Sequence, residues 1–268
     1  MKQRVLVGIP LVLLLLAEVF VDSVALTLVI LVFGALAQVE MSKALNAAGY
    51  TPTLWTGLTF FALIYPTDMY FGANGVLMLF AILAGINMCW AVFQHERRFM
   101  DIIMSEFILC YPALPFYFLF MIKTIEPHIL SVIAMCMTLI IASLNDTLAY
   151  FIGSKFGKNK LSPELSPKKT VEGAVAGIAG SVVIGFVILM LIRGKYIPDI
   201  HWAHLLFGCL VSSIFATVGD LIASAVKRFC NIKDYGKIFP GHGGVMDRLD
   251  SYLLSAVAIY TYFSIFIL

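Results

Sequence analysis

Long apolar segments occupy most of this chain and follow one another with only short polar breaks. The hydrocarbon core of a bilayer takes about 20 apolar residues per helix. Hydrophobic residues make up 61% of the chain and charged residues 13%, against roughly 25% charged residues in soluble domains. We therefore predict an all-α, polytopic integral membrane protein of about nine transmembrane helices. The predicted helices lie near residues 4–21, 23–39, 54–67, 72–94, 102–122, 128–152, 173–192, 203–226 and 251–268.

A single integral-membrane domain, residues 1–268, is the simplest interpretation of this pattern. Within it, we expect N-terminal helices over residues 1–127 and chemistry-bearing helices over residues 128–268. The second group contains two polar loops, 153–173 and 227–250.

The distribution of Lys and Arg predicts the orientation in the membrane. With nine helices and a cytoplasmic N-terminus, 15 of the 18 Lys and Arg residues fall on the cytoplasmic side. The other three are Lys123, Arg193 and Lys195. Both polar loops then face the cytoplasm and can meet. The N-terminal run has the basic start of a signal peptide, but further apolar segments follow at once, so we interpret it as an uncleaved transmembrane helix.

Two kinds of binding site are not indicated. The five cysteines form no CxxC pair and no Cys/His cluster, so we expect neither disulfides nor a zinc site. The net charge of +2 does not point to nucleic acid, and none is expected as a partner.

Residues 220–250 combine four Asp, five Lys or Arg, one His and five Gly or Pro in an otherwise apolar chain. Ionisable groups in membrane helices indicate functional sites by default. On a helix, Asp220, Ser224 and Lys227 would share one stripe. Asp146 lies near the end of another apolar run, beside Asn145. The alternative is that each acid lies at the interface and pairs with a nearby Lys.

The sequence GHGGVMDRLD, residues 241–250, has the composition of a phosphate and metal site. Glycines let backbone N–H groups approach a ligand closely, and such nests bind phosphate oxygens. Asp247 and Asp250 would share a helix face if the last helix begins here, and paired carboxylates suit Mg²⁺. His242 could orient a phosphate or act as an acid; the alternative is a histidine bonded to the backbone. The cations available to balance a polyanion are Lys227, Arg228, Lys233 and Arg248.

The earlier loop repeats this theme. Ser166, Lys168, Lys169 and Thr170 present two hydroxyls and two cations before an expected helix start. Lysines and helix N-termini both favour anions, so phosphate binding is one interpretation. Lysines that fix the topology and contact anionic lipid are an equally good one.

Residues 224–250 resemble the signature of the phosphatidate cytidylyltransferases, the CDP-diacylglycerol synthases. The pattern is S-x-hydrophobic-K-R, four residues, K-D-x-small, two residues, hydrophobic-P-x-H-G-G-hydrophobic-x-D-R-hydrophobic-D, and the chain fits it in register from Ser224 to Asp250. The earlier loop is also similar, with SPKKT at 166–170, but Val171 stands where the family often has Trp. The resemblance is specific over about residues 145–251, and the N-terminal half matches only as an apolar multi-helix region.

The resemblance implies a nucleotidyltransferase of phospholipid biosynthesis that converts CTP and phosphatidic acid into CDP-diacylglycerol and pyrophosphate with Mg²⁺. It also implies a metal centre on Asp220 and Asp247, which could be dinuclear with one monovalent ion. A homodimer follows from family likeness alone, and a bacterial inner membrane with a cytoplasmic active site is the expected location.

Combining both lines of argument gives one set of site residues. As catalytic residues we expect Asp220, Asp247, Lys227, Arg228 and His242. As substrate-binding residues we expect Ser166, Lys168, Lys169, Thr170, Ser224, Lys233, Asp234, Gly243, Gly244 and Arg248. As metal ligands we expect Asp220, Asp247, Asp146 and Asp250.

Three other functions remain open at this point. A related CTP-using enzyme could act on an archaeal-type ether lipid or phosphorylate a polyprenol. A transporter or channel would place acids near mid-membrane on paired broken helices, whereas Asp146 and Asp220 lie toward the ends of their runs. An inactive scaffold would leave the cluster of carboxylates without a role.

Overall fold

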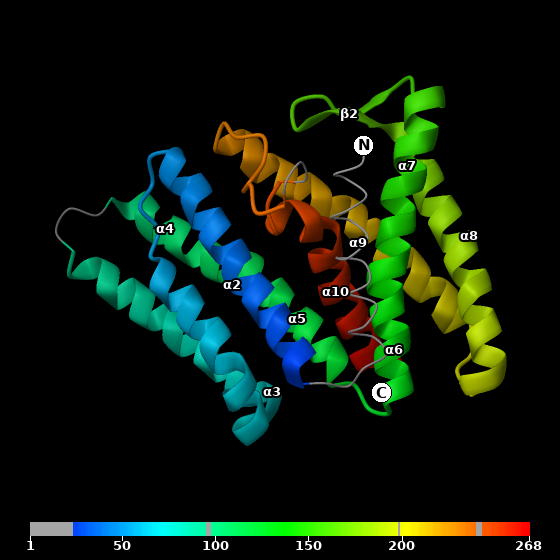
Figure 1. The fold of residues 1–268 in the computed structure, drawn as a ribbon, viewed down its shortest axis with the longest axis horizontal. Helices are drawn as coiled ribbons and strands as arrows, with labels where there is room; N and C mark the ends of the chain where they lie inside the picture. Colours follow the sequence, from blue (N-terminus) through cyan, green and yellow to red (C-terminus); the bar gives the residue numbers. More distant parts are fainter. Residues whose placement is uncertain (1–23, 95–97, 198, 240–242) are drawn as a thin grey trace. The chain divides into compact units, whose positions relative to one another are not determined.

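The computed structural model describes residues 24–94, 98–197, 199–239 and 243–268. They form two compact units (Figure 1). Unit 1 comprises the described residues of 24–117 and 227–248, and unit 2 those of 118–226 and 249–268. The predicted first helix, 4–21, lies outside the described residues, so the count of nine stays a prediction.

Unit 1 begins with α2 (Val24–Ala47), which continues about two turns beyond its predicted end. It is followed by α3 (Leu54–Val92). α3 turns back on itself at Gly72, whose φ of 63° and ψ of −168° interrupt the helix (Figure 1). A positive φ favours glycine. The rings of Trp55 and Trp90, at opposite ends of α3, are 6.1 Å apart, so the two arms correspond to the two helices predicted over this stretch.

The helical stretch that follows α3 in unit 1 is broken. α4 (Phe99–Ile108) leads into the π-helical segment η1 (Leu109–Ala113) and then into α5 (Leu114–Lys123), which crosses into unit 2. Tyr111 leaves helical geometry just before Pro112, because proline lacks an N–H and clashes with the preceding turn.

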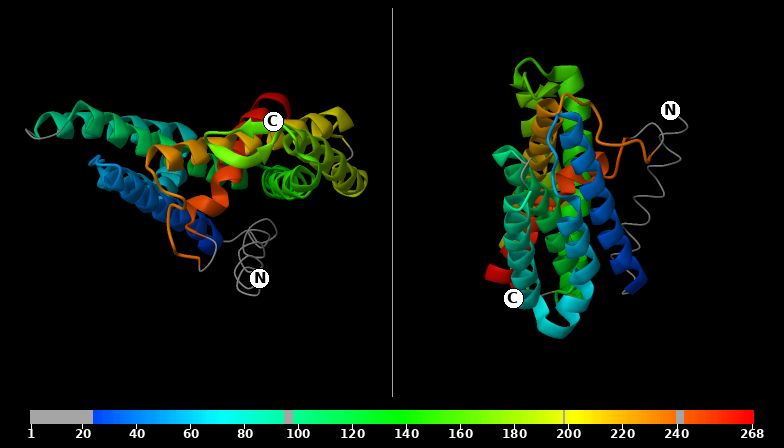
Figure 2. Two further views of the ribbon diagram at one scale, coloured as in Figure 1. Left: turned by 90° about the horizontal axis from the view of Figure 1, so that it is seen from above. Right: turned by 90° about the vertical axis from the view of Figure 1, so that its left-hand side faces the viewer.

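Unit 2 is built from α6 (His128–Cys136), η2 (Met137–Ile141), α7 (Ala142–Phe156), β1 (Lys160–Ser162), β2 (Ser166–Thr170) and α8 (Val171–Tyr196), with most of α9 (Trp202–Phe229) and α10 (Met246–Phe266). α7 and α8 run side by side (Figures 1 and 2). Glycine permits this approach: a Cβ on Gly177 would lie 2.8 Å from the backbone oxygen of Asn145. Close packing of small residues is typical of helices in membranes.

The segment between α7 and α8 corrects the prediction of a plain loop. α7 continues to Phe156, and β1 and β2 then pair as an antiparallel hairpin. The hairpin is tied to α8, because the carboxylate of Glu172 accepts hydrogen bonds from the backbone N–H groups of Lys158 (3.0 Å) and Asn159 (3.1 and 3.2 Å). Helix propensity and hydropathy do not indicate these contacts, because Glu172 lies 13 and 14 positions after its partners.

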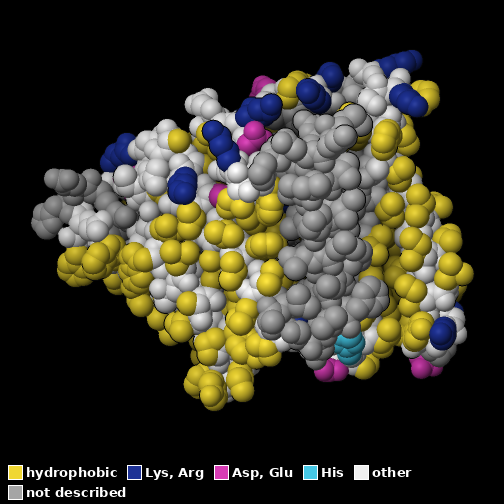
Figure 3. Space-filling model, viewed as in Figure 1, with side chains coloured by type: hydrophobic (Ala, Val, Ile, Leu, Met, Phe, Trp, Pro, Cys, Tyr) yellow, Lys and Arg dark blue, Asp and Glu magenta, His cyan; other side chains and the backbone are white. Residues whose placement is uncertain are grey.

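The described residues contain seven helices long and apolar enough to cross a membrane. Along α8, Val175, Val183 and Leu191 are 61–77% exposed, and apolar side chains cover the drawn faces of α3 and α8 (Figure 3). Such surfaces fit a lipid environment. The chain is therefore an integral membrane protein, as predicted.

Candidate active site

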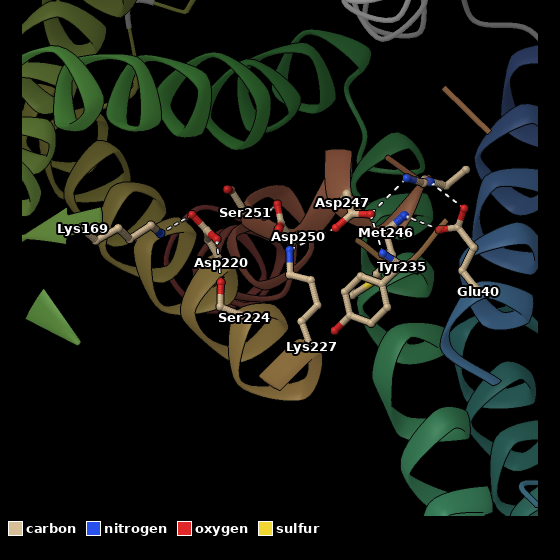
Figure 4. Close-up of polar contacts among 12 residues, drawn as sticks. Glu40, Lys169, Asp220, Ser224, Lys227, Tyr235, Met246, Asp247, Asp250 and Ser251 are labelled. Atoms are coloured by element: carbon tan, nitrogen blue, oxygen red, sulfur yellow. Dashed lines mark hydrogen bonds and ion pairs between the residues drawn. The ribbon is translucent and has the colours of Figure 1, made fainter. Parts of the chain in front are cut away.

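In unit 1, Asp247 anchors the segment that precedes α10. Its Oδ2 accepts hydrogen bonds from the backbone N–H of Tyr235 (2.7 Å) and of Gly244 (3.0 Å). Its Oδ1 pairs with the Lys227 ammonium at 3.0 Å (Figure 4). The Asp247 side chain is 2% exposed and the Lys227 side chain is 13% exposed. Charge-assisted hydrogen bonds of this kind are strong in buried surroundings, so the predicted Asp247 and Lys227 form one rigid group.

Glu40 is a site residue that the sequence reasoning missed. From α2, its two carboxylate oxygens accept hydrogen bonds from the backbone N–H groups of Val245 (3.0 Å) and Met246 (2.9 Å) (Figure 4). Those groups open α10, where a helix leaves its first amides without partners. The sequence did contain a signal for Glu40, because it is an acid inside an apolar run. The same criterion selected Asp146.

The glycine segment, meaning the described residues of 235–246, packs against these carboxylates. Gly243 has a φ of +87°, which favours glycine, and its carbonyl accepts a hydrogen bond from Phe239 N–H at 2.9 Å. Gly244 gives its N–H to Asp247. Phosphate binding by Gly243 and Gly244 therefore stays a prediction. His242, predicted as a catalytic residue, lies outside the described residues.

In unit 2, Asp220 joins the two stretches that the sequence singled out separately. Lys169, from β2, donates a hydrogen bond to Asp220 Oδ2 on α9 (Figure 4). Ser224 Oγ lies 3.5 Å from Asp220 Oδ1. The Lys169 and Asp220 side chains are 29% and 21% exposed. The predicted loop lysine and the predicted helix acid are therefore one partly exposed ion pair.

Asp146 and Asp250 lie in the same corner of unit 2. Ser251 Oγ donates to Asp146 Oδ2 at 2.7 Å, and Ser251 N–H donates to Asp250 Oδ1 at 3.0 Å. The sequence reasoning did not select Ser251. Gly219, next to Asp220, packs against the backbone of Asp250, where an added Cβ would lie 2.7 Å from the carbonyl oxygen. Ser251 thus links Asp146 on α7 to Asp250 on α10, and Gly219 lets α9 approach the backbone of Asp250.

Gly219→Ala is expected to destabilise this corner by about 1–3 kcal/mol, because backbone atoms rather than a flexible side chain must move. Gly194→Ala is the matched control, since a Cβ there meets nothing within 4 Å. Thermal unfolding in detergent compares the two variants. Equal melting temperatures would contradict the close approach of α9 to α10.

The structure places the other predicted residues as follows. α9 extends to Phe229 and α10 begins at Met246, so the predicted loop 227–250 is shorter than expected, and Asp247 and Asp250 do lie on the last helix. Thr170 Oγ1 caps α8 by accepting from Gly173 N–H at 3.1 Å, and Ser166 begins β2. The exposed residues are Lys168, Arg228, Lys233, Asp234 and Arg248.

The carboxylates are donors of the type that Mg²⁺ requires. Among the residues that the structure describes, no group of three or more His, Cys, Asp or Glu side chains could hold a metal ion by itself. Mg²⁺ usually takes one or two carboxylates and completes its shell with water and substrate phosphates. The predicted acids could therefore each supply one carboxylate to Mg²⁺, with water and substrate phosphates as the other ligands.

Comparisons with known proteins match the chain along nearly its full length. The sequence model of the Cytidylyltransferase family covers residues 2–266. The chain is 32% identical over 272 residues to the phosphatidate cytidylyltransferase of Bacillus subtilis, spanning 99% of this chain and 98% of that protein. It is 31% identical over 279 residues to the phosphatidate cytidylyltransferase of Mycobacterium bovis, spanning 97% and 87%.

A shorter stretch is more similar still. Over 117 residues, or 42% of each chain, identity to the phosphatidate cytidylyltransferase of Staphylococcus epidermidis is 43%. The sequence signature predicted this relationship, and the full-length matches confirm it. The chain therefore belongs to the cytidylyltransferase family and is a nucleotidyltransferase.

Proposed function

We propose that this enzyme is an Mg²⁺-dependent phosphatidate cytidylyltransferase, which makes CDP-diacylglycerol and pyrophosphate from CTP and phosphatidic acid in phospholipid biosynthesis. The main support is that the in-register signature contains Asp247 and Lys227, a carboxylate and an ammonium paired at 3.0 Å in buried surroundings. The printed names of the relatives agree with this substrate assignment.

The reaction needs charge control more than a base. A phosphate oxygen of phosphatidic acid, already anionic at neutral pH, attacks the α-phosphorus of CTP, and the bond to the bridging oxygen of the leaving pyrophosphate breaks. No proton has to be removed from the nucleophile. The protein must bring two polyanions together and stabilise charge on the leaving group.

The cations near the acids are suited to this task. Lys227, beside Asp247, and Lys169, beside Asp220, are held by ion pairs, so a polyanion meets ammonium groups that are already positioned. The exposed Arg228, Lys233, Arg248 and Lys168 provide further countercharge. Because a carboxylate balances each held lysine, neither charge is left without compensation.

The proposed Mg²⁺ ligands are Asp247 in unit 1 and Asp220 in unit 2, with Asp146 and Asp250 as the other carboxylates available. When bound, the ion would neutralise the phosphate oxygens of CTP and of the departing pyrophosphate. A second, monovalent ion remains part of the proposal.

We further propose that the protein lies in a bacterial inner membrane with the site facing the cytoplasm, and that it is a homodimer. The cytoplasmic orientation rests on the Lys and Arg distribution, and the bacterial membrane is suggested by the bacterial relatives. The homodimer rests on family resemblance alone.

Purified protein in lipid nanodiscs tests the substrate assignment. With CTP, phosphatidic acid and Mg²⁺ we expect release of pyrophosphate and formation of CDP-diacylglycerol, and no product when ATP replaces CTP. An ether-lipid phosphate and a polyprenol are the competing acceptors. Product from either of these, with none from phosphatidic acid, would reassign the substrate but leave the family unchanged.

A further inference from the structure

Glu40 is a buried acid that neither the signature nor the proposed mechanism uses. Its residue is 4% exposed, and it lies on α2, some 200 positions before its hydrogen-bond partners. A buried carboxylate is costly unless its oxygens are hydrogen-bonded. Here both oxygens accept backbone N–H groups, at 3.0 and 2.9 Å. The protein therefore retains an acid in an apolar helix and satisfies both of its oxygens at one specific place.

Two glycines make room for this carboxylate. A Cβ on Gly236 or on Gly244 would collide with the Glu40 carboxylate. These positions lie on either side of the bridge between Phe239 and Gly243. The glycine segment is therefore shaped around Glu40 as well as around Asp247.

Glu40 and Asp247 divide the amides of this segment between them. Asp247 accepts from Tyr235 and Gly244, and Glu40 accepts from Val245 and Met246. Three consecutive N–H groups, 244–246, are thus bound by carboxylates of the chain itself. A helix N-terminus can bind phosphate, but here a fixed internal anion takes that place.

We infer that Glu40 is a positioning residue for nucleotidyl transfer: it fixes the first turn of α10 and the glycine segment, and so fixes the orientation of Asp247. The inference rests on the proposed function for its catalytic consequence. Groups that orient a metal ligand typically change metal affinity or activity by about 10–100-fold when they are replaced. Glu40 accepts hydrogen bonds from the backbone N–H groups of Val245 and Met246, which lie two residues and one residue before Asp247. This is close enough for Glu40 to influence the orientation of the Asp247 carboxylate.

Glu40→Gln is the sharpest test, because glutamine keeps the shape but has one oxygen where two amides need an acceptor. Hydrogen–deuterium exchange of the metal-free protein should be faster over residues 235–247 and unchanged in α8. In the activity assay, the Mg²⁺ concentration for half-maximal rate should rise about 10-fold. Asn46→Gln, at an exposed position on the same helix α2, is the matched control and should change neither measurement.

Glu40→Asp separates positioning from simple folding. Aspartate keeps the carboxylate on a shorter side chain, so this variant should retain more exchange protection and a more nearly normal Mg²⁺ response than Glu40→Gln. It also provides the test if Glu40→Gln does not fold. Unchanged exchange over residues 235–247 would overturn the inference. So would a lower rate with an unchanged Mg²⁺ dependence, since that result means only fewer folded molecules. A wild-type protein that makes no product contradicts the proposed function instead, and the exchange experiment still decides whether Glu40 holds the segment.

Discussion

Asp247→Asn is expected to remove nearly all cytidylyltransferase activity, with kcat/KM falling more than about 100-fold. The asparagine amide cannot accept from Tyr235 and Gly244 and also balance Lys227, as the carboxylate does. Breaking a buried ion pair by removing one partner costs about 3–5 kcal/mol, so the melting temperature should fall as well. Pyrophosphate release and thermal unfolding measure the two effects.

Lys237→Gln provides the control for Asp247→Asn. Lys237 is exposed in the same segment and has no part in the proposed chemistry, so its variant should keep full activity and stability. If Asp247→Asn also keeps full activity, the family assignment stands but the proposed metal site is wrong. If it loses stability but not the rate per folded molecule, Asp247 is only a structural anchor.

Asp220→Asn is expected to lower kcat/KM by more than about 100-fold with a smaller loss of stability. The Asp220 side chain is 21% exposed, against 2% for Asp247, so less of the unpaired charge is left buried. Cytidylyl transfer should nevertheless be strongly impaired, because the variant removes a proposed Mg²⁺ ligand and the counter-ion of Lys169. The Mg²⁺ dependence of the residual rate is the measurement, with the exposed Glu164→Gln as the control.

A double-mutant cycle with Lys169→Gln tests the ion pair itself. Residues in one salt bridge give non-additive effects, so the double variant should be less impaired than the two single effects combined. Strict additivity would mean that Lys169 and Asp220 act independently and that their contact in the structure has no functional consequence.

The membrane class and the family were readable from the sequence because both depend on local information. A bilayer requires long apolar helices whatever their packing, and the signature from Ser224 to Asp250 has a fixed spacing. The glycine and proline breaks were also local signals. Gly72 separates the two arms of α3, and Pro112 follows the non-helical Tyr111.

Tertiary structure alone decided which of the selected groups contact one another. The sequence determined the chemical types of the site, namely carboxylates, lysines and glycines, but hydropathy treats Glu40 only as one more acid in an apolar run. Pairing of Lys169 with Asp220, and of Glu40 with the start of α10, joins residues 51 and about 205 positions apart. Such contacts depend on how helices pack, and small residues such as Gly219 and Gly244 permit them. Packing is a property of the whole fold, so no local pattern encodes it.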